Sequence, residues 1–230
     1  MTHVLVPGAG GDSWYWHRLI PLLEQRGEPV IAVDLPAGDE TAGLAEYADA
    51  IVAAAAGATD ITVVAHSMGG VSAPLVCGRL DVRRIVLVNA MIPLPGETAG
   101  DWWANTGQHA AWAANEAAQG RDPDAEFDVA AGFFHDVPDD VRAEAFERDS
   151  QQADKPFAEP WPLTQWPDVP TFGIAGADDR LFPVHFQQQV ARERLGLALD
   201  VVPGGHLLAL ANPAGLAAAL DNVGWRSHQG

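Results

Sequence analysis

Short apolar runs alternate with longer stretches of helical periodicity along most of the chain. The apolar runs are rich in β-branched residues and occupy 2–6, 29–34, 61–65, 84–89, 169–175 and 197–202. Such runs are typical of strands buried on both faces of a sheet. Helical periodicity covers 14–26, 44–56, 71–79, 183–195 and 213–223. The alternation predicts an α/β fold with about six mostly parallel strands and helices on both faces of the sheet.

The alternation stops between the fourth and fifth predicted strands. Residues 92–165 hold no convincing strand, although helical patches such as 140–149 occur. The stretch carries fifteen acidic and four basic residues, and five of the eight tryptophans lie in it or next to it: Trp102, Trp103, Trp112, Trp161 and Trp166. A stretch this long inside a compact domain is usually a lid or binding element, although its aromatic residues can also bury a small core of their own. We predict one domain, 1–230, with a core of 1–91 and 166–230 and a lid insertion at 92–165.

A candidate nucleophile follows the third predicted strand. Residues 65–70 read Ala-His-Ser-Met-Gly-Gly, and a predicted helix comes directly after them. Strand, tight turn and helix form the context of a nucleophile elbow, in which the serine hydroxyl stands above the sheet. The small residues Ala65 and Gly69 let strand and helix pass closely, and the backbone N–H of Met68 points to where an oxyanion would form. The alternative interpretation is that Ser67 is an ordinary helix N-cap.

A serine hydroxyl is a poor nucleophile until a base removes its proton, and that base needs an acid to orient it. Among the eight histidines only His206 follows a predicted strand, on a glycine-flanked loop that reaches the same edge of the sheet as Ser67. His3 and His66 are interpreted as structural residues beside the first strand and the elbow. The other histidines, among them His228, have no supporting pattern.

The acid is expected after the fifth predicted strand, between serine and histidine in the chain. Two adjacent aspartates, Asp178 and Asp179, satisfy this requirement. Either one could instead cap the helix that begins near Pro183. The residues alone therefore leave both aspartates open.

Composition limits the partners that the protein can have. Thirteen basic and 31 acidic residues give a formal net charge of −18, which argues against nucleic acid and anionic membranes as partners. Cys77 is the only cysteine, so neither an intrachain disulfide nor a thiolate metal cluster is expected. The chain begins directly with a strand and holds no apolar run long enough to span a bilayer. We expect a cytoplasmic protein that needs no metal or organic cofactor.

Four stretches together resemble the α/β-hydrolase superfamily, and the similarity covers nearly the whole chain. They are Pro7-Gly8-Ala9, the elbow at 65–70, the stretch 176–183 (Gly-Ala-Asp-Asp-Arg-Leu-Phe-Pro) and Gly205-His206. The similarity is closest to the small group that contains plant methylesterases and hydroxynitrile lyases, whose opening resembles residues 4–9, Trp14 and 19–24.

The resemblance implies roles for individual residues. In such proteins the acid stands three residues after the glycine and four before the proline, which selects Asp179. The implied fold has the first strand beside the third, and family practice makes the backbone N–H groups of Ala9 and Met68 the oxyanion hole. Pro7 departs from the family, which usually has a histidine at that position.

The resemblance also separates possible chemistries. The lyases of the group carry a threonine where this chain has Gly8, and a lysine after the catalytic histidine where it has Leu207. Hydrolysis is therefore favoured: a serine hydrolase, or carboxylesterase, that cleaves an ester of a small neutral or apolar molecule through an acyl-enzyme. The alternatives are a lactonase, a C–C bond hydrolase or lyase with the same triad, and a ligand-binding member without turnover. A Cys77 nucleophile is disfavoured because no base lies beside it.

Overall fold

Six parallel strands form the central sheet of the computed structural model, which describes residues 1–148 and 151–226. The strands are β1 (Thr2–Val6), β2 (Val30–Ala32), β3 (Ile61–His66), β4 (Val82–Val88), β5 (Thr171–Gly176) and β6 (Leu199–Val202). Every pair of neighbouring strands is parallel. The predicted parallel sheet is therefore observed, with β2 and β6 shorter than the apolar runs that predicted them.

The order of the strands, β2-β1-β3-β4-β5-β6, brings the first and third strands together, as expected. Val6 at the end of β1 pairs with Ala65 near the end of β3. The chain winds away from this pair in both directions, so the carboxyl ends of β1 and β3 form a topological switch point. Ligands of open α/β sheets bind at such points.

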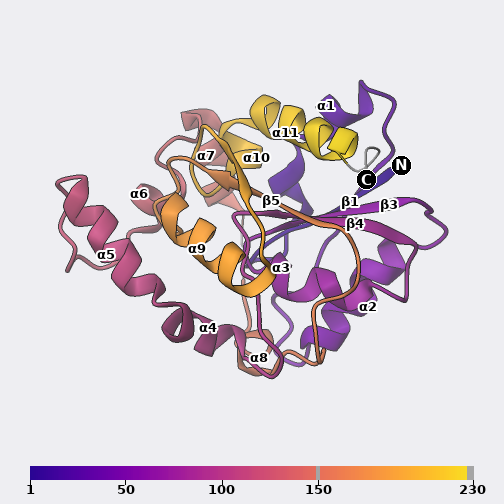
Figure 1. Cartoon of the computed structure of the whole chain (residues 1–230). Coiled ribbons are helices and arrows are strands. Elements are labelled where there is room, and N and C mark those ends of the chain that lie inside the picture. The colour runs from indigo at the N-terminus through magenta and orange to yellow at the C-terminus, as the bar shows by residue number, and fades with distance from the viewer. Residues whose placement is uncertain (149–150, 227–230) are drawn as a thin grey trace.

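Helices cover both faces of the sheet (Figure 1). One apolar layer contains α2 (Leu44–Ala54), α3 (Gly69–Ser72) and α9 (Val184–Leu195), and the other contains α1 (Ile20–Glu24), α10 (Leu208–Ala211) and α11 (Pro213–Arg226). Strand residues alternate between the layers: Val63 and Ala65 belong to the first, and Val64 to the second. This alternation arises because successive side chains of a strand point to opposite faces.

Two predicted helices are interrupted. The stretch 14–26 forms the 3₁₀ helix η1 (Ser13–Trp16) and then α1, which has Pro21 in its first turn. The stretch 71–79 begins earlier, as α3, and changes into the 3₁₀ helix η2 (Ala73–Val76). Pro74 explains the change because it has no N–H to continue an α-helical ladder. Cys77 consequently follows the helix in extended backbone, and its predicted place inside a helix is wrong.

Helices α4 (Ala99–Thr106), α5 (Gln108–Ala118), α6 (Val129–Phe133), α7 (Asp139–Glu147) and α8 (Lys155–Ala158) make up the stretch 92–165, hereafter the helical segment. Backbone hydrogen bonds tie its two ends together, from Gly96 to Trp161 (3.0 Å) and from Trp161 to Glu97 (2.9 Å). Trp102 and Trp161 are buried in the apolar layer of α2 and α9. Part of the aromatic content of the segment thus fills the core.

Two sequence predictions fall at the limits of the described chain. The helix predicted at 140–149 is observed as α7, while Asp149 and His228 lie outside the described residues. Within the described ranges, no helix combines the length and the apolar character needed to cross a membrane.

Candidate active site

Ser67 occupies the tight turn between β3 and α3, where its backbone φ is 51°. This left-handed conformation is strained for a residue with a side chain. Three backbone hydrogen bonds hold it: the Ser67 N–H donates to Val88 (3.2 Å), and the Ser67 carbonyl accepts from Gly70 (3.1 Å) and Met91 (3.0 Å). The strand–turn–helix arrangement predicted around Ser67 is therefore present, and it is anchored to β4 and to the loop that follows β4.

Close packing explains the small residues around Ser67. A Cβ atom on Gly69 would lie 2.7 Å from the carbonyl oxygen of Pro7, and one on Gly70 would lie 2.1 Å from the carbonyl oxygen of Met91. Both neighbours are backbone atoms, so neither could move aside without distorting its loop. Ala65 is completely buried, and its methyl group is accommodated in the core.

The structure brings Ser67, His206 and Asp179 together in one hydrogen-bonded relay. His206 Nε2 lies 3.1 Å from Ser67 Oγ, and His206 Nδ1 lies 2.8 Å from Asp179 Oδ2. Asp179 and His206 are buried, whereas Ser67 is partly exposed. An imidazole that donates Nδ1–H to the carboxylate leaves Nε2 free to accept the serine proton.

The two candidate aspartates have different partners. Oδ1 of Asp179 accepts from the backbone N–H groups of Leu181 and Phe182, both at 2.9 Å, while Oδ2 faces His206. Asp178 instead accepts from the backbone N–H of Gly204 at 3.2 Å. Asp179 is the aspartate placed to orient the imidazole. Asp178 instead fixes the loop that carries His206.

His66 packs beneath the relay. Its Nε2 donates to the backbone carbonyl of His206 at 2.9 Å, and its ring stacks on Tyr15 with centroids 4.3 Å apart. Burial lowers the pKa of His66 well below its usual value, and the nearby His206 lowers it further. A neutral, buried imidazole of this kind fits the structural role predicted for His66.

Sequence reasoning did not find the residues that fix the loop carrying His206. Asp136, from the helical segment, accepts from the backbone N–H of Gly205 at 2.6 Å. Asn89 donates from Nδ2 to the carbonyls of Gly205 (3.1 Å) and His206 (2.9 Å). No motif marks either residue, and only the place of Asn89 at the end of a predicted strand hinted at this edge of the sheet.

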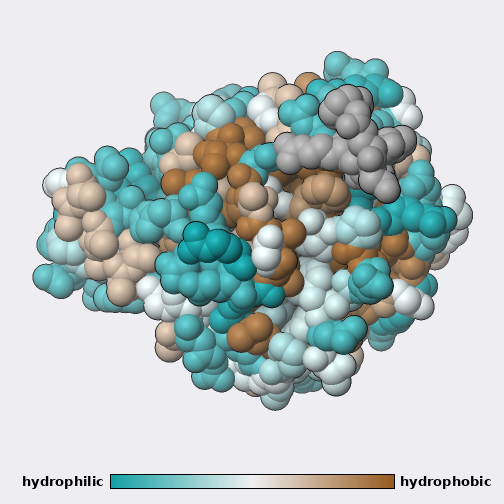
Figure 2. Space-filling model, viewed as in Figure 1, coloured by the Kyte–Doolittle hydropathy of each residue, from teal (hydrophilic) through white to brown (hydrophobic). Residues whose placement is uncertain are grey.

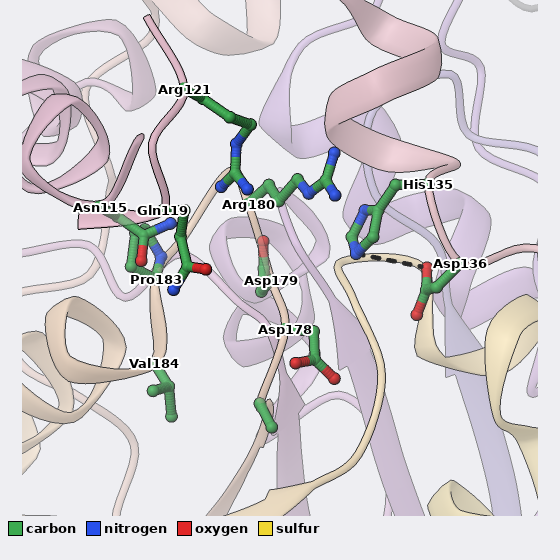
Figure 3. A pocket seen from close by; sticks show the side chains of 11 residues that line it. Asn115, Gln119, Arg121, His135, Asp136, Asp178, Asp179, Arg180, Pro183 and Val184 are labelled. Atoms are coloured by element: carbon green, nitrogen blue, oxygen red, sulfur yellow. Dashed lines mark ion pairs between the residues drawn. The ribbon is translucent and has the colours of Figure 1, made fainter. Parts of the chain in front are cut away.

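A polar pocket of about 260 Å³ lies behind the loop between β5 and α9 that carries Asp179, hereafter the acid loop (Figure 3). Arg121 and Arg180 project into it above Asp179, while Asp178 and Asp136 flank the loop of His206. Arg121 is already paired with Glu116 through two contacts of 2.6 Å. The pocket therefore surrounds the supports of the relay and does not expose Ser67, which is not among its lining residues.

The predicted oxyanion-hole residues flank the carboxyl ends of β1 and β3. Ala9 is exposed in the loop after β1, and Met68 directly follows Ser67. Within residues 1–148 and 151–226, no hydrogen bond occupies the backbone N–H of either residue. The backbone N–H groups of Ala9 and Met68 are thus two donors without a partner in the described chain.

An apolar cavity of about 510 Å³ opens between the helical segment and the acid loop. It is lined by Trp103, Gln108, His109, Trp112, Ala125, Glu126, Phe127, Val129, Phe133 and Leu181. Phe133 also packs against the His206 ring, with centroids 5.2 Å apart. Phe133 thus lies between the cavity and the His206 ring, while Ser67 and His206 are not among the lining residues, of which Gln108, His109 and Glu126 are polar.

Other candidate chemistry finds little support in the described chain. Burial raises the pKa of the Cys77 thiol to about 11, which disfavours the thiolate that a cysteine nucleophile requires. Among the described residues, no cluster of three histidine, cysteine or acidic side chains is arranged to hold a metal ion.

A family model described as the alpha/beta hydrolase family matches residues 4–219. The chain belongs to the alpha/beta hydrolase family. The predicted fold class is confirmed by this match and by a solved structure of polyneuridine aldehyde esterase. That structure has a TM-score of 0.77 at 21% identity, over 97% of this chain and 98% of that one.

Two plant proteins illustrate which members of the alpha/beta hydrolase family resemble this one in sequence. A probable esterase of Oryza sativa subsp. indica, PIR7A, is 34% identical over 110 residues, covering 42% of this chain and 41% of the relative. Methylesterase 7 of Arabidopsis thaliana is 36% identical over 103 residues, covering 39% of this chain and 40% of the relative. The chain spans about two fifths of the length of these curated relatives. The predicted resemblance to plant methylesterases is confirmed.

Proposed function

We propose that this alpha/beta hydrolase is a serine esterase in which Ser67 is the nucleophile, His206 the general base and Asp179 the orienting acid. The observation that carries the proposal is the unbroken relay, with contacts of 3.1 Å and 2.8 Å. The esterase names of the plant relatives support it.

The proposed reaction has two halves. Ser67 Oγ attacks the ester carbonyl while His206 Nε2 takes its proton, and the alkoxide then leaves with that proton as an alcohol. Water, deprotonated by the same imidazole, cleaves the resulting acyl-enzyme and releases the acid. Asp179 stabilises the imidazolium that forms in each half. Protons and electron pairs balance without a metal or organic cofactor.

The backbone N–H groups of Ala9 and Met68 form the proposed oxyanion hole. Both lack a partner within the described chain and lie at the switch point beside Ser67. Donors that already point toward the developing negative charge stabilise the transition state strongly. The loss of one donor typically costs about 10²- to 10³-fold in rate.

The proposed substrate is an ester with a small neutral or apolar group. The apolar cavity beside Phe133 accepts such a group, and burial there contributes about 25 cal/mol per Å² of apolar surface. Residues 92–165, which supply most of its wall, are proposed to act as the lid of a single domain whose core is 1–91 and 166–230. The fifteen acidic residues of this segment disfavour an anionic ester through repulsion.

The first test is covalent labelling with a fluorophosphonate. The protein should be labelled once, at Ser67, and should hydrolyse short-chain and aromatic esters. Ser67→Ala should lose both label and turnover. Ser72→Ala is the matched control, since Ser72 is buried in α3 and its hydroxyl donates to the Gly69 carbonyl. A folded wild type without label or turnover would instead indicate a ligand-binding member of the family.

The second test concerns charge. Matched neutral and anionic esters of similar size should differ in kcat/KM in favour of the neutral one, and the difference should shrink as salt screens the acidic surface. A preference for the anionic ester would contradict the proposed substrate class without affecting the proposed mechanism.

A further inference from the structure

We propose that Asn89 and Gln187 form a buried amide pair that positions the acid and the base of the relay relative to each other. The inference rests on the proposed esterase function and adds two positioning residues to it. Within the described chain, no hydrogen bond joins either side chain to Ser67, so each would act through Asp179 or His206.

Asn89 joins the loops that follow three strands. It lies directly after β4, is completely buried and has a backbone φ of 46°. Besides donating to the carbonyls of Gly205 and His206, it accepts at Oδ1 from the backbone N–H of Gly176 at 2.7 Å. Gly176 ends β5 and begins the acid loop. One side chain therefore fixes the distance between the start of the acid loop and the loop of the base.

Gln187 extends this contact to the carboxylate. It is buried on α9, and its Nε2 lies 3.2 Å from Asn89 Oδ1, 3.2 Å from Asp179 Oδ2 and 2.7 Å from the Phe182 carbonyl. An amide nitrogen carries two hydrogens, so these three acceptors share them. The same Asp179 oxygen accepts from His206 Nδ1, which makes Gln187 the second donor to the oxygen that orients the base.

Both oxygens of the Asp179 carboxylate therefore accept hydrogen bonds from two donors each. Oδ1 of Asp179 has two backbone donors, and Oδ2 has His206 and Gln187. Rotation of the buried carboxylate would break several of these bonds at once. A buried polar network of this kind, with its members satisfied, specifies one arrangement of its parts.

Core packing alone does not require this pair. A buried amide costs free energy unless it is fully hydrogen-bonded, and an apolar side chain of similar volume would fill the space as well. The side-chain hydrogen-bond partners of Asn89 and Gln187 within the described chain all belong to the acid loop, the loop that carries His206, or each other. The polar groups are therefore placed where they act on the relay.

The test compares Gln187→Met with Gln188→Met. Methionine keeps the length and volume of glutamine, and Gln188 is exposed on the same helix. Gln187→Met should lower kcat roughly tenfold with KM within about twofold. Loss of a donor strengthens the attraction between Asp179 and the protonated base, so the acidic limb of the kcat/KM profile should move to higher pH by roughly 0.5 unit. Gln188→Met should match the wild type in every respect.

Asn89→Asp provides an independent variant, because aspartate tolerates the left-handed backbone as asparagine does. Its carboxylate would face the carbonyls of Gly205 and His206 and repel them, and kcat and the rate of fluorophosphonate labelling should both fall by roughly 10²-fold. The retained fold would be checked by circular dichroism and thermal unfolding.

The outcomes separate the two proposals. An active, labelled wild type with Gln187→Met and Asn89→Asp equal to it in kcat and pH profile would overturn the positioning role alone. A wild type that neither labels at Ser67 nor hydrolyses esters would overturn the esterase proposal, and the positioning role with it. Reduced kcat with an unchanged pH profile in Gln187→Met would also count against positioning, because general destabilisation produces that pattern.

Discussion

At the residue scale, Gly8 shows how tightly the loop after β1 is packed against the proposed nucleophile. A Cβ atom at this position would lie 2.9 Å from Ser67 Cβ and 3.1 Å from His66 Nδ1. The backbone of Gly8 is not left-handed, so the constraint is space and not conformation. This loop therefore has no room for a larger side chain at position 8 without moving.

Gly8→Ala should therefore displace either Ser67 or the oxyanion-hole loop. Overpacking of this kind typically costs about 1–3 kcal/mol, and we expect kcat/KM for a short-chain ester to fall at least roughly tenfold. Gly38→Ala is the control, because a Cβ there would make an ordinary contact of 3.5 Å with Gln151. Equal activity of both variants would contradict the prediction, because it would show that the loop accommodates an extra methyl group at position 8.

At the scale of elements, helices α5 and α6 and the loop between them shape the apolar cavity, while α4 fastens the helical segment to the core. Trp102 donates from its indole nitrogen to the carbonyl of Ile92 at 3.1 Å and is buried. Phe127, by contrast, is 37% exposed, lines the cavity and packs edge-to-face on Phe133 at 5.1 Å. Different aromatic residues of one segment thus pack into the core and line the cavity proposed to take the substrate.

Phe127→Ala should weaken binding of large apolar esters selectively. Removal of a half-buried phenyl ring is expected to cost about 1 kcal/mol, or roughly fivefold in kcat/KM, for an aromatic ester. An acetate ester should be almost unaffected. Phe146→Ala is the matched control, since Phe146 is 54% exposed and does not line the cavity. A Phe146→Ala variant with the same selective loss would place the substrate elsewhere.

At the scale of the whole molecule, two buried histidines, His3 and His66, couple the stability of the fold to pH. On the face seen in Figure 2, hydrophobic residues form separate areas between hydrophilic ones. Burial lowers the pKa of His66 well below its usual value of 6.5 and also lowers that of His3, which Glu28 partly opposes. In the unfolded chain both imidazoles would regain their ordinary affinity for protons.

Acid should consequently destabilise the fold already below pH 6.5. Between that value and the lower folded pKa values, the unfolded chain binds more protons, so the free energy of unfolding falls as pH falls. Above pH 6.5 the contribution of both histidines to stability is fully present. Urea denaturation at pH 7.5 and 5.5 measures the difference in the free energy of unfolding between the two pH values. His66→Gln should reduce the difference, and His185→Gln, at an exposed position of α9, should leave it unchanged. An identical difference in wild type and His66→Gln would contradict this account.

The sequence by itself determined the parallel sheet, its helices and the order of serine, acid and histidine along the chain. These features follow from local patterns: β-branched runs, helical periodicity, and glycines at the elbow, where an added Cβ on Gly69 would come within 3 Å of a neighbouring carbonyl oxygen. The choice of Asp179 over Asp178 came from resemblance, because two adjacent carboxylates look alike until their directions are known.

Only the tertiary structure decided what surrounds these residues. Asn89, Asp136 and Gln187 lie far apart in the chain and have no motif, and they converge because β4, the helical segment and α9 pack around the ends of β5 and β6. The cavity likewise depends on which tryptophans turn inward to the core and which face the acid loop. Local sequence encodes elements, whereas contacts between distant side chains exist only once those elements pack.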